Sequence, residues 1–192
     1  MNMSEDILAI KISTANQCLA EIQEAYGRQN KVSARIKFPR GFIRPASNLR
    51  RSLPNLGNEI QRRNASYALI TLDVLSWIAI RTDLDGAALS MVVKEAISNI
   101  GELCEWMTKE ATRGTGSRRS YVIRTQRLVD EMMISDELKQ ELDWIWEIRC
   151  NEHLHEVTEL EHTLYARADY NRARSAYAQL KKSLIDAYGY SP

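Results

Sequence analysis

Residues 67–80, YALITLDVLSWIAI, form the most apolar stretch of the chain and decide its fold class. With its flanks, from Asn58 to Arg81, the segment is apolar on most sides of a helix, which predicts a central and well-buried helix. The stretch is too short to span a bilayer, and it contains Asp73. We therefore expect a core helix here and no membrane segment.

Apolar residues recur at helical spacing on both sides of this stretch. The further expected helices cover residues 4–26, 87–111 and 121–133, a long helix that begins at 135 or 136 and continues past 148 into the segment of Arg149 and the histidines, and a closing helix from about 169 to 188. Ser4, Ser135 or Asp136, and Asp169 are the expected N-caps. Gly27 and Gly189 are expected to end the first and last helices. Because no segment alternates with the period of a strand, we predict an all-α bundle of five or six helices.

The composition fits one globular domain with two regions. Of the 192 residues, 44% are apolar and 27% charged, and the 8 Gly and 4 Pro are few enough to favour helix. Three of the prolines fall between residues 28 and 57, where no period is sustained. We expect an N-terminal helix with a basic irregular arm over residues 1–57 and a helical bundle over residues 58–192.

Charge is polarised along the chain although the net charge is +1. Residues 28–63 hold ten basic side chains against Glu59, and residues 131–161 hold ten acidic ones against Lys139 and Arg149. Lys and Arg contacts dominate non-specific nucleic-acid binding, whereas a charge run on its own is commonly a solvated loop. The residues predicted to bind nucleic acid are Arg35, Lys37, Arg40, Arg44, Arg50 and Arg51.

The cysteines and the N-terminus indicate where the protein works. Cys18, Cys104 and Cys150 are widely separated and form no Cys-x-x-Cys pair, which fits a reducing compartment. The first residues are acidic and lack the apolar core of a signal peptide. We expect a cytoplasmic protein that does not associate with a membrane.

All three histidines lie within ten residues: His153, His155 and His162. They follow Arg149 in the segment RCNEHLH, late in the chain. Because a helix advances about 100° per residue, Arg149 and His153 share a face if the helix continues. His155 competes if the helix ends or bends there, or if groups from a second subunit take part.

An arginine beside a histidine can cleave RNA without a metal. Histidine titrates near neutrality, so it can take the proton of a ribose 2′-OH or protonate the departing 5′-oxygen. Arginine is always charged and matches phosphate with two donors. Asn151 is an additional neutral donor. The expected products are a 2′,3′-cyclic phosphate and a 5′-hydroxyl.

The spacing from Arg149 to His155, with five residues between, resembles the R-x(4–6)-H motif of the HEPN superfamily (higher eukaryotes and prokaryotes nucleotide-binding domains). The polar residue that usually follows the family's arginine is Asn151 here, one place late because of Cys150. At the level of the fold, the resemblance covers about the C-terminal two-thirds of the chain. It implies that Arg149 contacts phosphate, that His155 is the catalytic histidine with His153 in reserve, and that Asn151 assists.

The resemblance also implies partners and a setting. HEPN domains pair across a two-fold axis, which joins two Arg-His pairs in one cleft that cuts single-stranded RNA without metal or other cofactor. Many are toxins or phage-defence ribonucleases restrained by a cognate antitoxin or regulatory protein. Others are non-catalytic modules that bind a protein, a nucleotide or a nucleic acid, and this is the alternative function. A metal site built from Cys150 and the histidines is disfavoured because His-x-His places the imidazoles on different helical faces.

Overall fold

The structure, a computed structural model, describes residues 3–113, 120–150 and 164–192. Within these ranges the chain is helical and holds no strand beyond one isolated bridge between Pro54 and Tyr190. The elements are α1 (Glu5–Tyr26), η1 (Val32–Ala34), α2 (Ala46–Arg51), α3 (Glu59–Arg81), α4 (Gly86–Ala111), α5 (Tyr121–Asp130), α6 (Asp136–Cys150) and α7 (Arg167–Tyr188). The all-α class predicted from the sequence is confirmed. In the described part of the chain, no helix is both long and apolar enough to cross a membrane.

The chain divides into two compact units, Met1–Arg40 and Gly41–Pro192. The sequence changes character near residue 57, yet the packing changes at residue 40. The reason is that three leucines of the supposed irregular arm, Leu49, Leu53 and Leu56, are buried in the core of the second unit. Residues 41–57, including the short helix α2, therefore belong to the bundle.

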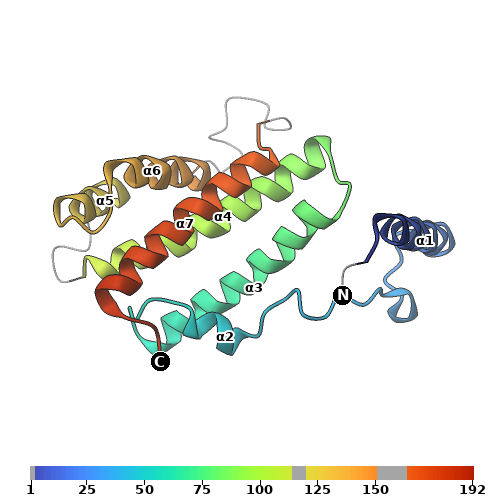
Figure 1. The fold of residues 1–192 in the computed structure, drawn as a ribbon, viewed down its shortest axis with the longest axis horizontal. Helices are drawn as coiled ribbons and strands as arrows, with labels where there is room; N and C mark the ends of the chain where they lie inside the picture. The colour runs from blue at the N-terminus through green and yellow to red at the C-terminus, as the bar shows by residue number, and fades with distance from the viewer. Residues whose placement is uncertain (1–2, 114–119, 151–163) are drawn as a thin grey trace. The chain divides into compact units, whose positions relative to one another are not determined.

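The central helix of the second unit is α4, not α3 as the sequence predicted. Helix α4 packs extensively on α3, α6 and α7 and also contacts α5, whereas the extensive contacts of α3 are with α4 and α2 (Figure 1). The apolar residues of α3 do surround the helix, but Tyr67 and Ile80 are about half exposed. The fully buried side chains of α4 form the middle of the core: Val93, Ala96, Ile97, Ile100, Cys104 and Met107.

The helix ends are fixed by local polar contacts. Asn58 Oδ1 accepts from Gln61 N at 2.9 Å while Gln61 Oε1 accepts from Asn58 N at 2.7 Å, which is a capping box at the start of α3. Ser135 Oγ accepts from Leu138 N at 3.2 Å, as predicted for a cap. The expected cap at Asp169 is wrong by three residues. Helix α7 begins at Arg167, and the Asp169 carboxylate accepts from Ala166 N at 2.8 Å.

The C-terminus is tied to the segment that precedes α3. Ser191 N donates to Leu53 O at 2.8 Å, and Asn55 N donates to Gly189 O at 2.9 Å. At the other end of α7, Arg167 donates to the carbonyl oxygens of Ala79 and Leu84 at 2.6 and 2.9 Å. Helix α7 is therefore held at both ends against segments that are distant in sequence.

Candidate functional site

Arg149 lies in the last turn of α6, where the backbone approaches α4 closely. A Cβ atom added at Gly101 of α4 would lie 3.1 Å from Arg149 Cβ and 3.4 Å from Ile145 Cγ2. A glycine at this point of α4 is what permits the two helices to pack so tightly. The base of the Arg149 side chain is therefore fixed by packing, before any polar contact is considered.

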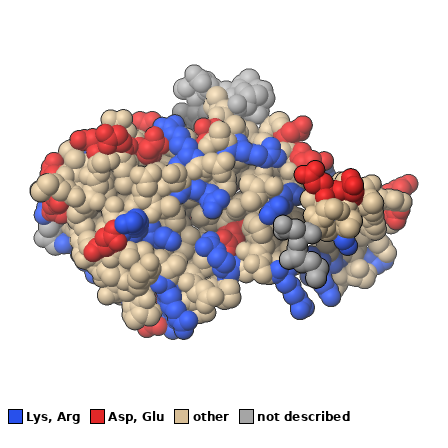
Figure 2. All heavy atoms as spheres, viewed as in Figure 1, with Lys and Arg blue, Asp and Glu red and all other residues tan. Residues whose placement is uncertain are grey.

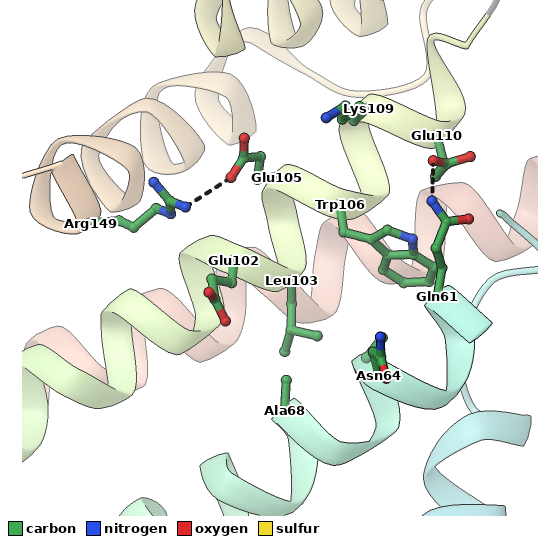
Figure 3. Close-up of a pocket in the computed structure, with 11 residues that line it drawn as sticks. Gln61, Asn64, Ala68, Glu102, Leu103, Glu105, Trp106, Lys109, Glu110 and Arg149 are labelled. Carbon is green, nitrogen blue, oxygen red and sulfur yellow. Dashed lines mark hydrogen bonds and ion pairs between the residues drawn. The ribbon is translucent and has the colours of Figure 1, made fainter. Parts of the chain in front are cut away.

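The guanidinium of Arg149 is held by an ion pair and an aromatic ring. Arg149 Nη2 lies 3.2 Å from Glu105 Oε2 of α4 (Figure 3). Its Cζ lies 4.9 Å from the centroid of the Trp146 ring. The side chain is still 30% exposed. Because an arginine carries five N–H donors, this one ion pair leaves donor capacity for a ligand.

The same carboxylate faces a second arginine. Glu105 Oε1 lies 3.8 Å from Arg124 Nη2 of α5, whose side chain is 8% exposed. Arg124 lies near the face of Tyr121, and Tyr121 stacks on Trp146 with 4.5 Å between ring centroids and 7° between ring planes. We call these five residues, from three helices, the Arg149 cluster: Glu105, Tyr121, Arg124, Trp146 and Arg149.

The Arg149 cluster has a net positive charge and a neutral aromatic centre. It contains two guanidinium groups against one carboxylate. Burial raises the pKa of Tyr121 well above its usual value, so its phenol stays protonated in the folded protein. Stacking and the shared carboxylate restrict the rotamers of both arginines, which is the pre-organisation that an anion-binding arginine needs.

Arg149 stands at one end of a groove of about 370 Å³ between α3 and α4. Leu103 and Trp106 of α4 and Ala65 and Ala68 of α3 provide its apolar wall (Figure 3). Its charged lining consists of Glu102, Glu105, Glu110, Lys109 and Arg149. The volume suits a small ligand or one or two side chains of a partner. Three carboxylates against two cations make its interior unfavourable for phosphate away from Arg149.

The other catalytic candidates lie outside the described residues. These are Asn151, His153 and His155, and His162 lies outside them as well. Both flanks of this segment are anchored in the second unit. Arg149 is held on α4, and Tyr165 N donates to Ser90 Oγ of α4 at 3.0 Å. Helix geometry favours His153 and the spacing of the motif favours His155. The choice between them stays open, because α6 is described as far as Cys150.

The predicted nucleic-acid-binding residues are divided between the two units. Arg35, Lys37 and Arg40 are exposed in the first unit. In the second unit, Arg51 is exposed and Arg50 is partly buried. Each unit therefore contains three of the six residues: Arg35, Lys37 and Arg40 in the first, and Arg44, Arg50 and Arg51 in the second.

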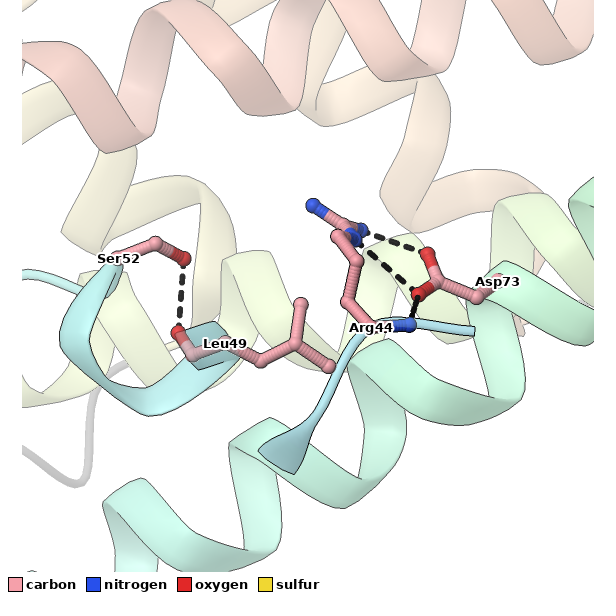
Figure 4. A network of polar contacts seen from close by, with 4 residues as sticks. All are labelled: Arg44, Leu49, Ser52 and Asp73. Carbon is pink, nitrogen blue, oxygen red and sulfur yellow. Dashed lines mark hydrogen bonds and ion pairs between the residues drawn. The ribbon is translucent and has the colours of Figure 1, made fainter. Parts of the chain in front are cut away.

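Arg44 has a structural partner. Its Nη2 lies 2.6 Å from Asp73 Oδ1, and its Nε and backbone N donate to Asp73 Oδ2 at 3.1 and 3.0 Å (Figure 4). The hydrogen bond to Asp73 raises the pKa of Arg44, and burial opposes the rise. This contact satisfies the buried carboxylate inside the apolar stretch of α3. It also ties residue 44 to the bundle beside α2, where Ser52 Oγ donates to Leu49 O.

Surface charge on the bundle is mixed. Helix α6 carries five acidic side chains against Lys139 and Arg149, whereas α7 carries five basic ones against Asp169 and Asp186. The face seen in Figure 2 accordingly shows Lys and Arg side chains interspersed with acidic ones. This face therefore offers no continuous basic field, and charge alone does not locate an RNA-binding surface on it.

Sequence reasoning identified Arg149 but missed the residues that hold it. Glu105, Tyr121 and Arg124 lie on α4 and α5, distant from the histidine segment in sequence, and no local motif marks them. Comparison of the chain with protein-family models, with curated proteins and with solved structures gave no match. The function of the chain is therefore inferred from this geometry and from the R-x(4–6)-H spacing.

Proposed function

We propose that this chain is a metal-independent endoribonuclease of the HEPN type that acts in a toxin or phage-defence setting. The observation that carries the proposal is the placement of Arg149. Its guanidinium is held by the other residues of the Arg149 cluster and is partly exposed beside a groove. In the sequence, Arg149 comes shortly before the segment that contains every histidine of the chain.

The residues suffice for the chemistry. One imidazole, of His153 or His155, takes the proton of the ribose 2′-OH, and O2′ attacks the neighbouring phosphorus. The bond from phosphorus to O5′ breaks, and a second, protonated imidazole gives O5′ its proton. Arg149 stabilises the charge that grows on the non-bridging oxygens, and Asn151 orients the phosphate. A two-fold dimer would supply the second imidazole from the other copy.

In this mechanism Glu105 is a positioning residue. It holds Arg149 in a single orientation before RNA arrives, so that less side-chain entropy is lost on binding. The exposed basic residues Arg35, Lys37 and Arg40 supply the sequence-independent affinity that the acidic α6 lacks. The proposed partners are single-stranded RNA, a second copy of the chain, and an antitoxin or regulatory protein.

A specific observation favours a second candidate, a non-catalytic helical module of HEPN-like fold. Arg149 already has a carboxylate partner, and the groove beside it is lined by Glu102, Glu105 and Glu110. Such a lining is better matched to a neutral or basic segment of a partner protein than to RNA. In this candidate function Arg149 stabilises the fold and takes no part in a reaction.

The experiment is cleavage of single-stranded RNA in excess EDTA by the wild-type chain and by Arg149→Ala, His153→Ala and His155→Ala. We expect wild-type cleavage that leaves 2′,3′-cyclic phosphate and 5′-hydroxyl ends, identified by mass spectrometry. Arg149→Ala should lower the rate by about 100-fold or more, the usual effect of removing one group that stabilises transition-state charge.

The two histidine variants identify the functional imidazole. The histidine whose replacement lowers the cleavage rate more is the one that supplies it. An absence of cleavage by the wild type, with the dimer present and the RNA bound, would favour the non-catalytic module. Full activity of both histidine variants would contradict the catalytic assignment altogether.

A further inference from the structure

Helix α1 in the first unit carries the spacing of a coiled-coil seam. Its apolar positions are separated by four, three, four, three and four residues: Leu8, Ile12, Ala15, Leu19, Ile22 and Tyr26. This is a 3.5-residue period, the period of a helix that packs along one partner helix. No residue of α1 is buried, and Leu8 and Ile12 are about half exposed.

The two halves of this seam differ in their surroundings. After Tyr26 the chain turns at Gly27, and η1 runs back beside the C-terminal half of α1. The result is a groove of about 520 Å³ whose apolar lining includes Leu19, Ile22, Tyr26, Ala34 and Ile36. The N-terminal half of α1 does not line this groove. The C-terminal half of the seam therefore forms one wall of a groove, whereas the N-terminal half is an exposed apolar ridge.

We propose that α1 pairs with α1 of a second copy as an antiparallel coiled coil, in which each N-terminal half fills the other copy's groove. Reversing the seam on itself places Leu8 of one copy opposite Tyr26 of the other, Ile12 opposite Ile22, and Ala15 opposite Leu19. In two of these pairs, Leu8–Tyr26 and Ala15–Leu19, a smaller side chain meets a larger one, and the third pair joins two isoleucines, so space is filled evenly. A parallel pair in register would set Ala15 against Ala15 and leave a gap. Because ridge and groove are on the same chain, the contact closes as a two-fold dimer.

Charge supports the same orientation. Glu5 and Asp6 begin α1, and its last turn holds no basic residue. The basic side chains Arg28, Lys31 and Arg35 follow Tyr26, and Lys31 and Arg35 line the groove. An antiparallel pair brings the acidic start of each helix to the basic groove of the other copy, whereas a parallel pair sets acid beside acid.

The positions that flank the seam carry a single charge, Lys11. The others are Ala9, Asn16, Cys18, Gln23 and Ala25. Flanking charges select a partner of opposite sign in coiled coils, and their near absence leaves self-pairing without repulsion. The ribonuclease proposal also predicts a two-fold dimer, so the mass of the wild-type particle does not separate the two proposals. The α1 variants below do separate them, because they test one contact of the dimer and leave Arg149 and the histidines unchanged.

The test is sedimentation equilibrium of the full chain with a matched pair of variants. Ile12 lies in the seam and Ile10 lies on the outer face of the same helix, and both are more than half exposed. We expect a wild-type dimer whose dissociation constant rises by at least roughly tenfold in Ile12→Glu, since an unpaired carboxylate enters an apolar contact. Ile10→Glu should leave the dimer unchanged. Neither residue is buried, so circular dichroism should show the same fold for both.

Orientation is tested by charge exchange. Lys31→Glu should weaken the dimer, and adding Asp6→Lys on the same chain should restore it. Cys18 is a further reporter, since antiparallel pairing centred between Ala15 and Leu19 brings the two Cys18 side chains together. In a Cys150→Ser background, oxidation should give a disulfide-linked dimer that Cys18→Ser abolishes.

Four outcomes would overturn the proposal. They are a monomeric wild type at tens of micromolar concentration (on the scale of ordinary dimer affinities), equal weakening by Ile10→Glu and Ile12→Glu, no rescue by the charge exchange, and a monomer that sediments with anionic vesicles. The last result would assign the exposed seam to a membrane surface.

Discussion

Two arginines of this protein make the same pair of contacts in different surroundings. Arg149 lies over Trp146 and pairs with Glu105, whereas Arg172 of α7 lies over Trp144 and pairs with Glu141. By contact geometry Arg172 is the better held. Its Nε lies 2.6 Å from Glu141, and its Cζ lies 3.9 Å from the centroid of Trp144.

The surroundings of the two side chains differ in the opposite direction from their contact geometry. The Arg172 side chain is 46% exposed, and its pair with Glu141 is a two-residue contact on the surface. Arg149 is 30% exposed, shares its carboxylate with the buried Arg124, and lies against a stacked pair of aromatic rings beside a groove. Local contact geometry alone therefore does not distinguish the two arginines, whereas, among the described residues, the shared, partly buried network beside a groove is present at Arg149 and not at Arg172.

Removal of each carboxylate measures how far the two arginines differ in what they contribute to stability. Glu105→Ala deletes a group that faces two guanidinium groups, one of them buried, so we expect a loss of about 2–3 kcal/mol in the free energy of unfolding. Glu141→Ala removes an exposed pair and should cost under about 1 kcal/mol. Urea denaturation measures both. Equal losses would show that the Arg149 cluster is no more cooperative than a surface ion pair.

The second prediction uses the buried phenol of the Arg149 cluster. Burial raises the pKa of Tyr121 in the folded state, while the unfolded chain ionises near the usual value of about 10. Above that pH the unfolded state loses its proton first, so stability falls as pH rises, by about 1.4 kcal/mol per unit for each such tyrosine. Tyr121→Phe should flatten the decline between pH 10 and 11. Tyr67→Phe, at a half-exposed tyrosine of α3, is the matched control for the loss of one phenol.

The third and smallest effect concerns the close approach of α4 and α6. Gly101→Ala gains helix propensity of up to about 1 kcal/mol, but the new methyl group meets Arg149 Cβ at 3.1 Å. Overpacking outweighs the gain, and we expect a net loss of about 1 kcal/mol in stability. Because α6 must shift, Arg149 moves with it. We therefore expect the cleavage rate to fall by more than the loss of folded protein explains. Unchanged cleavage at full stability would show that the position of Arg149 on α4 is unimportant.

The sequence predicted most of the secondary structure because the signals are local. Ser4 caps the start of α1 and Gly27 follows its last residue, as expected, and α3 begins beside Asn58, within one residue of the predicted start. The misplaced cap at Asp169 shows the limit of such rules. A carboxylate three residues inside a helix can accept a hydrogen bond from the backbone N–H of the N-cap residue. In the sequence, such an acidic residue cannot be told from one that caps the helix itself.

The tertiary placement could not be derived in the same way. Apolar residues around α3 suggested a central helix, but α4 takes that place because small residues such as Ala96 and Gly101 permit close packing on several sides. Likewise, Arg149 was recognisable from its motif, while Glu105 and Arg124 became part of the site through the packing of three helices. Their roles depend on contacts between segments separated by tens of residues.

Under the ribonuclease proposal, Arg149 acts on RNA and its surface counterpart Arg172 does not. The direct measurement is the rate of single-stranded RNA cleavage in EDTA by Arg149→Ala and Arg172→Ala, compared at equal folded concentration. Each variant removes an arginine that lies over a tryptophan ring and forms an ion pair with a glutamate. We predict a loss of about 100-fold or more for Arg149→Ala and less than about twofold for Arg172→Ala. Equal rates for the two variants would contradict the assignment of Arg149 to the catalytic site.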